Sequence, residues 1–476
     1  MYKYKYNIYT IFFIVLESLA QTDPGSVRKG VWILSISTFV KKVLDGGGVK
    51  VPHHKETQFF PTEVMPVPAQ IILPMSQHIG APCEPVVKKG DKVYVGTMVG
   101  KGPVPLSMNI YSSASGVVNS VKPVLYNTGK MVMTVTIDTD GQQDIDPNIT
   151  PPDVHDLDSF TAAVSESGIV GLGGAGFPTD IKIVPKNLAD VDTLLINGAE
   201  CEPYLSTDNR EMLECPEDVL FGIEQTLKYL GISKAMICIE KNKPKAIELL
   251  TKLTADNDRI SVKSLPSKYP QGAQNILIKN ATGRVVPRGA RHTSVGVLML
   301  NVTTVSSIGK YIKTGIPLVT KRMTVAGDAV SHWKNLDVLI GTPMIDVLRY
   351  CGIEEQPGKV ITGGPMMGAA QKDVTYPITR QNNGLLALST RCSVNREAGA
   401  CIRCGRCVRS CPMGLSPVDI ENAYEKYDAD KLMDLMADLC IGCGTCSYVC
   451  PAKRPLTQSN VLASKYTKSK LKGAKK

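Results

Sequence analysis

Between residues 158 and 301 the spacing of apolar positions changes several times along the chain. Apolar residues recur three and four positions apart, as on one face of a helix, over residues 158–167, 216–230 and 244–253. Short continuous apolar runs, which are typical of strands, lie at residues 193–196, 235–239 and 259–264. This alternation predicts an α/β domain over residues 158–301.

The neighbouring stretches have shorter segments, separated by glycine and proline. Residues 60–137 are rich in valine, and residues 86–96 and 112–118 resemble the two halves of a biotinyl/lipoyl-like barrel-sandwich. We therefore expect such a module over residues 41–141. Carrier domains of this kind present a modified lysine at a hairpin tip, but the tip here, residues 104–109, has no lysine. We expect a structural module without a swinging cofactor. An acidic linker follows, and residues 302–390 predict a small β-grasp-like domain.

The first 40 residues form an N-terminal extension of unusual composition. Lys3 and Lys5 precede an apolar run at residues 8–16, which has the shape of a secretory signal but is too short to span a bilayer. The chain has no methionine between Met1 and Met65. We expect the extension to come from an over-extended reading frame, with a real signal or anchor as the alternative.

The charge is distributed unevenly. The chain has 476 residues and a formal net charge of +10, and residues 453–476 contain eight Lys/Arg and no acid. This composition predicts a disordered, solvated basic tail over residues 456–476, with contact to anionic lipid or an acidic partner as the alternative. The basic residues are not interleaved with aromatic ones, so nothing points to nucleic acid.

Two cysteine runs near the C-terminus carry the clearest chemistry. Each reads C-x₂-C-x₂-C-x₃-C-P, the run of two-cluster ferredoxins, in which the fourth cysteine ligates the other cluster. We assign two [4Fe–4S] clusters, the first to Cys401, Cys404, Cys407 and Cys450, and the second to Cys411, Cys440, Cys443 and Cys446. Structural zinc is the alternative, although it needs only four ligands.

The spacing around these runs predicts an α-helical two-cluster domain over residues 391–455. Residues 417–427 and 430–439 have helical periodicity, and Asp430 is a candidate N-cap. The remaining six of the fourteen cysteines are scattered, and eight cluster ligands indicate a reducing compartment. The whole chain therefore predicts a multidomain α/β protein with β-rich modules.

Two further stretches predict a ligand pocket in the α/β domain. Residues 171–179 form a Gly-rich loop whose bare backbone suits a phosphate or a flat ring, although a tight turn is the alternative. Residues 195–204 follow a predicted strand and place Glu200 and Glu202 at its carboxyl end, where ligands bind in α/β sheets. These two acids would accept hydrogen bonds from the hydroxyls of a ribose or ribityl chain, or would lie in a solvated loop.

The two stretches resemble segments of the NADH-oxidising flavoprotein subunit of respiratory complex I. That family has a Gly-Gly-Ala-Gly-Phe-Pro loop and an Asn-Ala-Asp-Glu-x-Glu-Pro segment at its FMN and NADH pocket. The resemblance implies FMN and NADH binding by Gly171, Gly173, Gly174, Gly176, Phe177, Lys182, Asn197, Glu200, Glu202 and Tyr204. Val170 and Leu172 stand where that family has arginine, so the pocket is similar rather than the same.

A wider resemblance covers residues 46–468. The motifs that carry it are residues 46–55, 77–80, 171–179, 200–204, Tyr269-Pro-Gln-Gly272, 363–368 and the two cysteine runs. In this order they resemble the RnfC family of the Rnf electron transport complex, except that Gln274 stands where we expect the family to carry glutamate. The resemblance implies a peripheral subunit on the cytoplasmic face of the bacterial inner membrane. Its complex couples electron transfer between NADH and ferredoxin to ion translocation, which other subunits would perform.

A flavin pocket and two clusters in one chain predict an electron inlet. FMN accepts a hydride from NADH and releases electrons singly to the clusters. Arg403, Arg406 and Arg409 beside the first cysteine run would favour the reduced cluster, or would form a docking face for an acidic partner. Two alternatives remain open, namely a soluble cobalamin reductase of bacterial microcompartments and a non-enzymatic electron-carrying scaffold.

Overall fold

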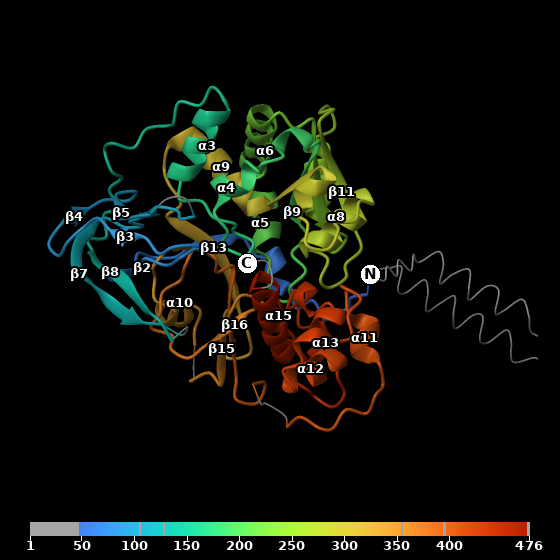
Figure 1. Ribbon diagram of the computed structural model, residues 1–476. Helices are drawn as coiled ribbons and strands as arrows, with labels where there is room; N and C mark the ends of the chain where they lie inside the picture. The colour runs from blue at the N-terminus through green and yellow to red at the C-terminus, as the bar shows by residue number, and fades with distance from the viewer. Residues whose placement is uncertain (1–46, 104–105, 127–128, 354–355, 394–396, 474–476) are drawn as a thin grey trace, which may run out of the picture. The chain divides into compact units, whose positions relative to one another are not determined.

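The computed structural model describes residues 47–103, 106–126, 129–353, 356–393 and 397–473 (Figure 1). The expectations for residues 1–40 and for positions 104 and 105 of the hairpin tip lie outside these ranges. From Gly48 onward the chain forms one unit. Nowhere in the described ranges is a helix long and apolar enough to cross a bilayer.

The N-terminal β-rich module consists of two small sheets. The first has the order β2-β8-β7-β4 and the second β3-β5-β6, and both are antiparallel. The strands are β2 (Gln70–Pro74), β3 (Glu84–Pro85), β4 (Lys92–Val93), β5 (Met98–Lys101), β6 (Ile110–Tyr111), β7 (Gly116–Leu125) and β8 (Met131–Thr139). Alternate residues of these short strands, among them Ile71, Leu73, Val135 and Ile137, form a shared apolar core.

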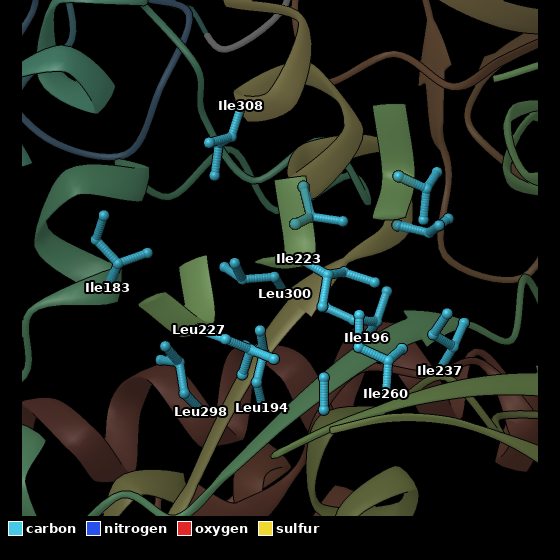
Figure 2. Packing of buried hydrophobic residues seen from close by; sticks show 14 of the residues in the cluster. Ile183, Leu194, Ile196, Ile223, Leu227, Ile237, Ile260, Leu298, Leu300 and Ile308 are labelled. Atoms are coloured by element: carbon cyan, nitrogen blue, oxygen red, sulfur yellow. The ribbon is translucent and has the colours of Figure 1, made fainter. Parts of the chain in front are cut away.

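The α/β region is built on a four-stranded parallel sheet of order β11-β10-β9-β12. Its strands are β9 (Thr193–Gly198), β10 (Lys234–Glu240), β11 (Ile260–Leu265) and β12 (Val297–Asn301). Its helices are α3 (Leu157–Glu166), α4 (Thr179–Ile183), α5 (Thr207–Glu214), α6 (Pro216–Leu230), α7 (Pro244–Leu253), α8 (Gln274–Thr282) and α9 (Val302–Thr314). Figure 2 shows the packed side chains between sheet and helices, including Leu194, Ile196, Leu227 and Ile308.

Helices α6 and α9 cross at glycines. A Cβ on Gly222 would lie 2.0 Å from the carbonyl oxygen of Val305, and one on Gly309 would lie 2.5 Å from that of Asp218. The two backbones therefore touch directly. Helix α9 lies in the segment that the sequence assigned to the following domain, yet its buried residues Val305 and Ile308 belong to the α/β core.

A six-stranded mixed sheet of order β1-β14-β13-β17-β15-β16 follows. Its strands are β1 (Thr62–Val64), β13 (Thr320–Ala326), β14 (Lys334–Leu339), β15 (Lys359–Thr362), β16 (Ala369–Gln371) and β17 (Gly384–Leu388). Helix α10 (Met344–Tyr350) covers it through Met344, Val347 and Leu348. Strand β1 precedes the barrel-sandwich strands in the chain but pairs with β14, so the sheet incorporates a distant segment.

The C-terminal region is helical, as predicted. It contains α11 (Arg406–Ser410), α12 (Pro417–Glu425), α13 (Ala429–Asp434), η4 (Ala437–Leu439), α14 (Thr445–Tyr448) and α15 (Leu456–Gly473). The remaining short 3₁₀ helices of the described chain are η1 (Glu56–Phe59), η2 (Leu188–Asp190) and η3 (His292–Val295). Asp430 is not the N-cap of α13, because Asp428 starts that helix and its side chain accepts from the backbone N–H of Lys431.

The prediction of a disordered basic tail is wrong for residues 456–473. This segment is helix α15, which packs against α12 in the red part of Figure 1. Leu456, Asn460, Ala463 and Thr467 are buried along one face, while the lysines at 465, 468 and 470 face solvent. The buried side-chain amide of Asn460 donates to the carbonyl oxygen of Pro417 at 2.9 Å, so polar as well as apolar contacts hold the helix.

Candidate functional site

The Gly-rich loop is held by its own backbone and by α9. The N–H of Gly171 donates to the carbonyl of Phe177 at 2.8 Å, and the N–H of Gly176 donates to that of Gly171 at 3.0 Å. The N–H of Leu172 donates to the Thr304 hydroxyl at 3.0 Å. Gly174 has φ +103°, a left-handed conformation that favours glycine, and a Cβ there would meet nothing within 4 Å. The loop is therefore a fixed turn with an open outer side.

The segment after β9 turns sharply at the carboxyl end of the sheet. Asn197 fixes the turn, since its Nδ2 donates to the carbonyl of Gly272 at 3.0 Å and its Oδ1 accepts from the N–H of Ala199 at 3.1 Å. Glu200 has a left-handed φ of +46°. Its Oε1 accepts from the N–H of Asp208 at 2.7 Å, at the start of α5. These contacts direct the Glu200 carboxylate inward at the carboxyl end of the sheet, where the sequence predicts a ligand site.

A cavity of about 500 Å³ lies between the Gly-rich loop, this segment and the cysteine region. That volume is within the roughly 300–1,000 Å³ of cofactor pockets. The cavity is lined by Gly173, Asn197, Glu200, Cys201, Glu202, Leu205, Asp208, Tyr269, Pro270, Gly272, Ala273, Gln274, Asn275, Ile276, Asn301, Met367, Asn383, Met413 and Ile441. The structure thus brings four of the predicted pocket residues, Gly173, Asn197, Glu200 and Glu202, to one cavity.

Glu200 lies buried among charges at this cavity. Lys55 Nζ forms an ion pair with its Oε2 at 3.6 Å, which is beyond hydrogen-bond distance, and Lys243 Nζ donates to the backbone oxygen of Ala199 at 2.6 Å. Burial raises the pKa of Glu200, while the charges of Lys55 and Lys243 act in the opposite direction. Within the described chain, Oε2 has no hydrogen-bond partner. Because a buried acceptor without a donor is costly, this oxygen suits a hydroxyl supplied by a ligand.

Asp208 and Asn301 are pocket residues that the sequence reasoning missed. Asp208 accepts from Asn301 Nδ2 and from the Thr303 hydroxyl, both at 2.8 Å. Burial raises the pKa of Asp208. A signal for Asn301 was present, since it ends a strand and its side chain caps α9 by accepting from the N–H of Thr303 at 3.0 Å.

The other predicted pocket residues do not line the cavity. Gly171, Gly174, Gly176 and Phe177 build the turn around Gly173. Tyr204 instead stacks on His54 with ring centroids 5.0 Å apart and meets Trp333 edge-on. Lys182 lies on α4, where burial lowers its pKa to about 8.

Four of the eight cysteines line one open cavity of about 520 Å³. They are Cys401, Cys404, Cys407 and Cys450, the set assigned to the first cluster, and we call this cavity the outer site. Cys401 and the nearby Arg403, Arg406 and Arg409 are exposed. Gly405, at φ +69°, turns the chain into α11 within this run.

The second set lines a separate, more enclosed cavity, which we call the inner site. Cys411, Cys440, Cys443 and Cys446 form it together with Thr457 and Asn460 of α15. Burial raises the pKa of the Cys446 thiol to about 12. In the described chain no three His, Cys, Asp or Glu side chains are grouped so as to hold a single metal ion. Each set of four thiols surrounds a cavity, and this all-cysteine donor set fits an iron–sulfur cluster.

The inner site adjoins the pocket. Met413, two residues after Cys411, and Ile441, next to Cys440, line both the 500 Å³ cavity and the inner site. The same wall therefore separates the pocket from four thiols, whereas the lining residues of the outer site include none from the pocket.

Three models of known protein families match parts of the chain. The RnfC barrel sandwich hybrid domain matches residues 45–142, the Nuo51 FMN-binding domain matches residues 164–310, and the 4Fe-4S dicluster domain matches residues 400–453. The Nuo51 match extends over the Gly-rich loop, the segment after β9 and most of α9. The chain thus contains an FMN-binding domain and a 4Fe-4S dicluster domain.

Curated relatives are similar over most of the chain, and each is a subunit of a named complex. One, from the Na(+)-translocating ferredoxin:NAD(+) oxidoreductase complex of Acetobacterium woodii, is 41% identical over 82% of this chain and 90% of its own length. Another, from the proton-translocating ferredoxin:NAD(+) oxidoreductase complex of Clostridium ljungdahlii, is 40% identical over 78% and 82%. A third, from the ion-translocating oxidoreductase complex of Rhodobacter capsulatus, is 38% identical over 79% and 73%. With these relatives and its three matched domains, the chain belongs to the RnfC family of the ion-translocating (Rnf) oxidoreductase complexes.

Proposed function

We propose that this chain is the electron-inlet subunit of a membrane-bound complex that couples electron transfer between NADH and ferredoxin to ion translocation. The single observation that carries the proposal is the shared wall of Met413 and Ile441 between the pocket and the inner site. A two-electron donor site and a one-electron carrier must lie close together for such an inlet to work. The relatives named for sodium and for proton translocation support the class of complex and leave the ion open.

The residues of the pocket fit FMN. Gly173 offers backbone without a side chain, and Glu200 Oε2 offers a buried acceptor. Asp208 and Asn301 add further polar groups to the pocket lining. FMN, when bound, takes a hydride from NADH and delivers its electrons one at a time. The protein's own contribution is to bind and orient, with Asn197 fixing the turn that presents Glu200 and Glu202.

The proposed ligand sets are those of the sequence analysis. Cys411, Cys440, Cys443 and Cys446 would hold the inner cluster, and Cys401, Cys404, Cys407 and Cys450 the outer one. The shared wall supports the inner site as the first to exchange electrons with the pocket. The exposure of Cys401 and of the three neighbouring arginines supports the outer site as the point of exchange with another protein.

Two further expectations, on the six-stranded sheet and on the location of the chain, complete the proposal. The order β14-β13-β17-β15, with β13 and β17 parallel and α10 packed on the sheet, supports a β-grasp-like domain. We also assign the chain to the cytoplasmic face of the membrane as a peripheral subunit held by partner subunits, because NADH and ferredoxin are cytoplasmic. Ion translocation would then belong to those partners.

The test is anaerobic titration of the iron- and sulfide-reconstituted, FMN-loaded protein with NADH. We expect NADH to bleach both the flavin and the sulfur-to-iron absorbance. We further expect Glu200→Gln to weaken FMN retention, and Glu224→Gln, an exposed position on α6, to leave it unchanged. Stoichiometric zinc without visible absorbance, or clusters that dithionite reduces but NADH does not, would refute the inlet.

A further inference from the structure

Tyr269 occupies the junction of the pocket and the inner site. It is 2% exposed and lines the pocket, and its hydroxyl donates to the backbone oxygen of Cys443 at 2.7 Å. The same hydroxyl lies 3.2 Å from Glu202 Oε1. A single phenol therefore contacts a pocket carboxylate and the peptide of an inner-site cysteine.

The loop that carries Cys443 is fixed by this contact and by its neighbours. Glu202 Oε2 accepts from the N–H of Met366 at 3.0 Å. The carbonyl of Met366 in turn lies against Gly444, where a Cβ would be 2.6 Å from it. Tyr269, Glu202 and Met366 thus form a continuous contact around the Cys443–Gly444 peptide.

Tyr269 is itself held from its other side. Its backbone pairs with Val49 in both directions, at 2.8 and 2.9 Å. The adjoining N–H of Gly48 donates to the carbonyl of Ser410, next to Cys411, at 2.9 Å. Tyr269 is therefore linked through this N-terminal segment to the chain that carries Cys411, and through its own hydroxyl to the chain that carries Cys443. Tyr269 is therefore held rigidly, and a residue that orients a neighbouring group needs such support.

We propose that Tyr269 is a positioning residue that fixes the Cys443 peptide against the pocket and tunes the reduction of the inner site alone. This inference rests on the proposed function for the identity of the two sites. Hydrogen bonds around the ligating cysteines are one of the protein's means of setting cluster potential. The Tyr269 hydroxyl withdraws electron density from the Cys443 carbonyl, which favours the additional electron. Loss of the hydroxyl leaves that buried carbonyl oxygen without this donor and disfavours reduction.

The experiment is a dithionite redox titration of the reconstituted protein, followed by electron paramagnetic resonance, for wild type, Tyr269→Phe and Tyr229→Phe. Phenylalanine keeps the ring and removes only the hydroxyl. Tyr229 is the matched control, because its hydroxyl also donates to a backbone oxygen, that of Val154 at 2.6 Å, away from both sites. One hydrogen bond is worth roughly 0.5–1.5 kcal/mol, which is about a two- to tenfold change in the reduction equilibrium.

We expect Tyr269→Phe to make the inner site harder to reduce by up to about tenfold, with the outer site and Tyr229→Phe unchanged. Selective loss of inner-site iron in Tyr269→Phe would also support positioning. Unaltered potentials, an equal change at both sites, equal loss of iron from both, or the same shift in Tyr229→Phe would overturn the inference. Because dithionite supplies the electrons, this outcome is independent of whether NADH reduces the protein, so the two proposals fail separately.

Discussion

Replacing Gly222 by alanine sets two opposing effects against each other. Alanine normally stabilises a helix interior by about 0.5–1 kcal/mol relative to glycine. Here, however, the new Cβ would lie 2.0 Å from the Val305 carbonyl oxygen, well short of the 3.4 Å at which ordinary contact begins. The obstacle is backbone and cannot rotate away, so α6 and α9 must move apart to relieve the clash. Such overpacking costs about 1–3 kcal/mol, and we take the upper end because the clash is with a rigid helix.

The net expectation for Gly222→Ala is a loss of about 2 kcal/mol in unfolding free energy. The separation also moves α9, whose N-cap residue Asn301 donates a hydrogen bond to Asp208 in the pocket. We therefore expect lower flavin retention together with a lower unfolding midpoint, measured by circular dichroism and by bound-flavin fluorescence. A midpoint equal to or above that of wild type would refute the reasoning.

Gly309→Ala is the companion variant on the facing helix. Its Cβ would lie 2.5 Å from the Asp218 carbonyl oxygen, so the unfolding free energy should also fall, but by less than in Gly222→Ala. The double variant should lose less than the sum of the two, because helices already separated accommodate the second methyl group. Strict additivity would indicate that the helices do not separate as a unit.

Three further predictions concern the sites and pH. Cys404→Ser should lower the iron content from about eight toward about four atoms and retain the electron paramagnetic resonance signal of the inner site. Cys440→Ser should remove that inner-site signal. The same spectrum for both variants would contradict the assignment of the two ligand sets. Gly174→Val should reduce the FMN content, because relief of the backbone strain at φ +103° displaces the neighbouring pocket backbone. Gly90→Val is the control in the β-rich module. Its φ is +93° and its added Cβ would also meet no atom within 4 Å, so it imposes comparable strain and should leave the FMN content unchanged. Burial lowers the pKa of His292 from 6.5 to about 4, so the unfolded chain takes up the proton first and stability falls as pH drops below about 6.5. Urea unfolding should show wild type losing about 2 kcal/mol more than His292→Gln between pH 7 and pH 5, and parallel curves would contradict this.

Local signals predicted six elements of the α/β region, namely α3, α6, α7, β9, β10 and β11, but not α4, α5, α8, α9 or β12. Helices α6 and α7 match the predicted bounds, since each has proline in its first turn, and Gly231 ends α6 in a left-handed conformation. Asp428 and Asp430 are two positions apart and are chemically identical, so the pattern could not decide between them. The geometry of the folded turn favours Asp428.

The sequence analysis did not predict helix α15, because the basic composition of residues 453–476 favoured a disordered tail over the helical spacing of a few buried positions. Leu456, Asn460, Ala463 and Thr467 are separated by four, three and four positions, which is helical periodicity, but two of the four residues are polar. Their burial depends on the neighbouring α12, which accepts a hydrogen bond from Asn460. A pattern of apolar residues alone cannot show that a buried amide will find a partner.

The pocket was predictable only in part for a related reason. Glu200 and Glu202 follow a predicted strand, and ligands of α/β sheets bind at the carboxyl ends of strands, so these two residues could be assigned to the pocket from the sequence. Met413, Ile441 and Tyr269 reach the same wall from segments that are far apart in sequence, and no local pattern relates them. Tyr204 shares a motif with the two acids, yet its left-handed φ of +70° turns it toward His54 instead.

The position of α15 has a consequence for how the protein is assembled. Thr457 and Asn460 complete the wall of the inner site, yet they follow its four cysteines in the chain. During synthesis these four cysteines leave the ribosome before Thr457 and Asn460, so the inner-site thiols are more open to iron and sulfide before α15 docks than after it. The outer site keeps its exposed Cys401 after folding. Under the proposed ligand sets, Cys401 leaves the outer cluster open to solvent in the folded protein, whereas Thr457 and Asn460 of α15 cover one side of the inner cluster.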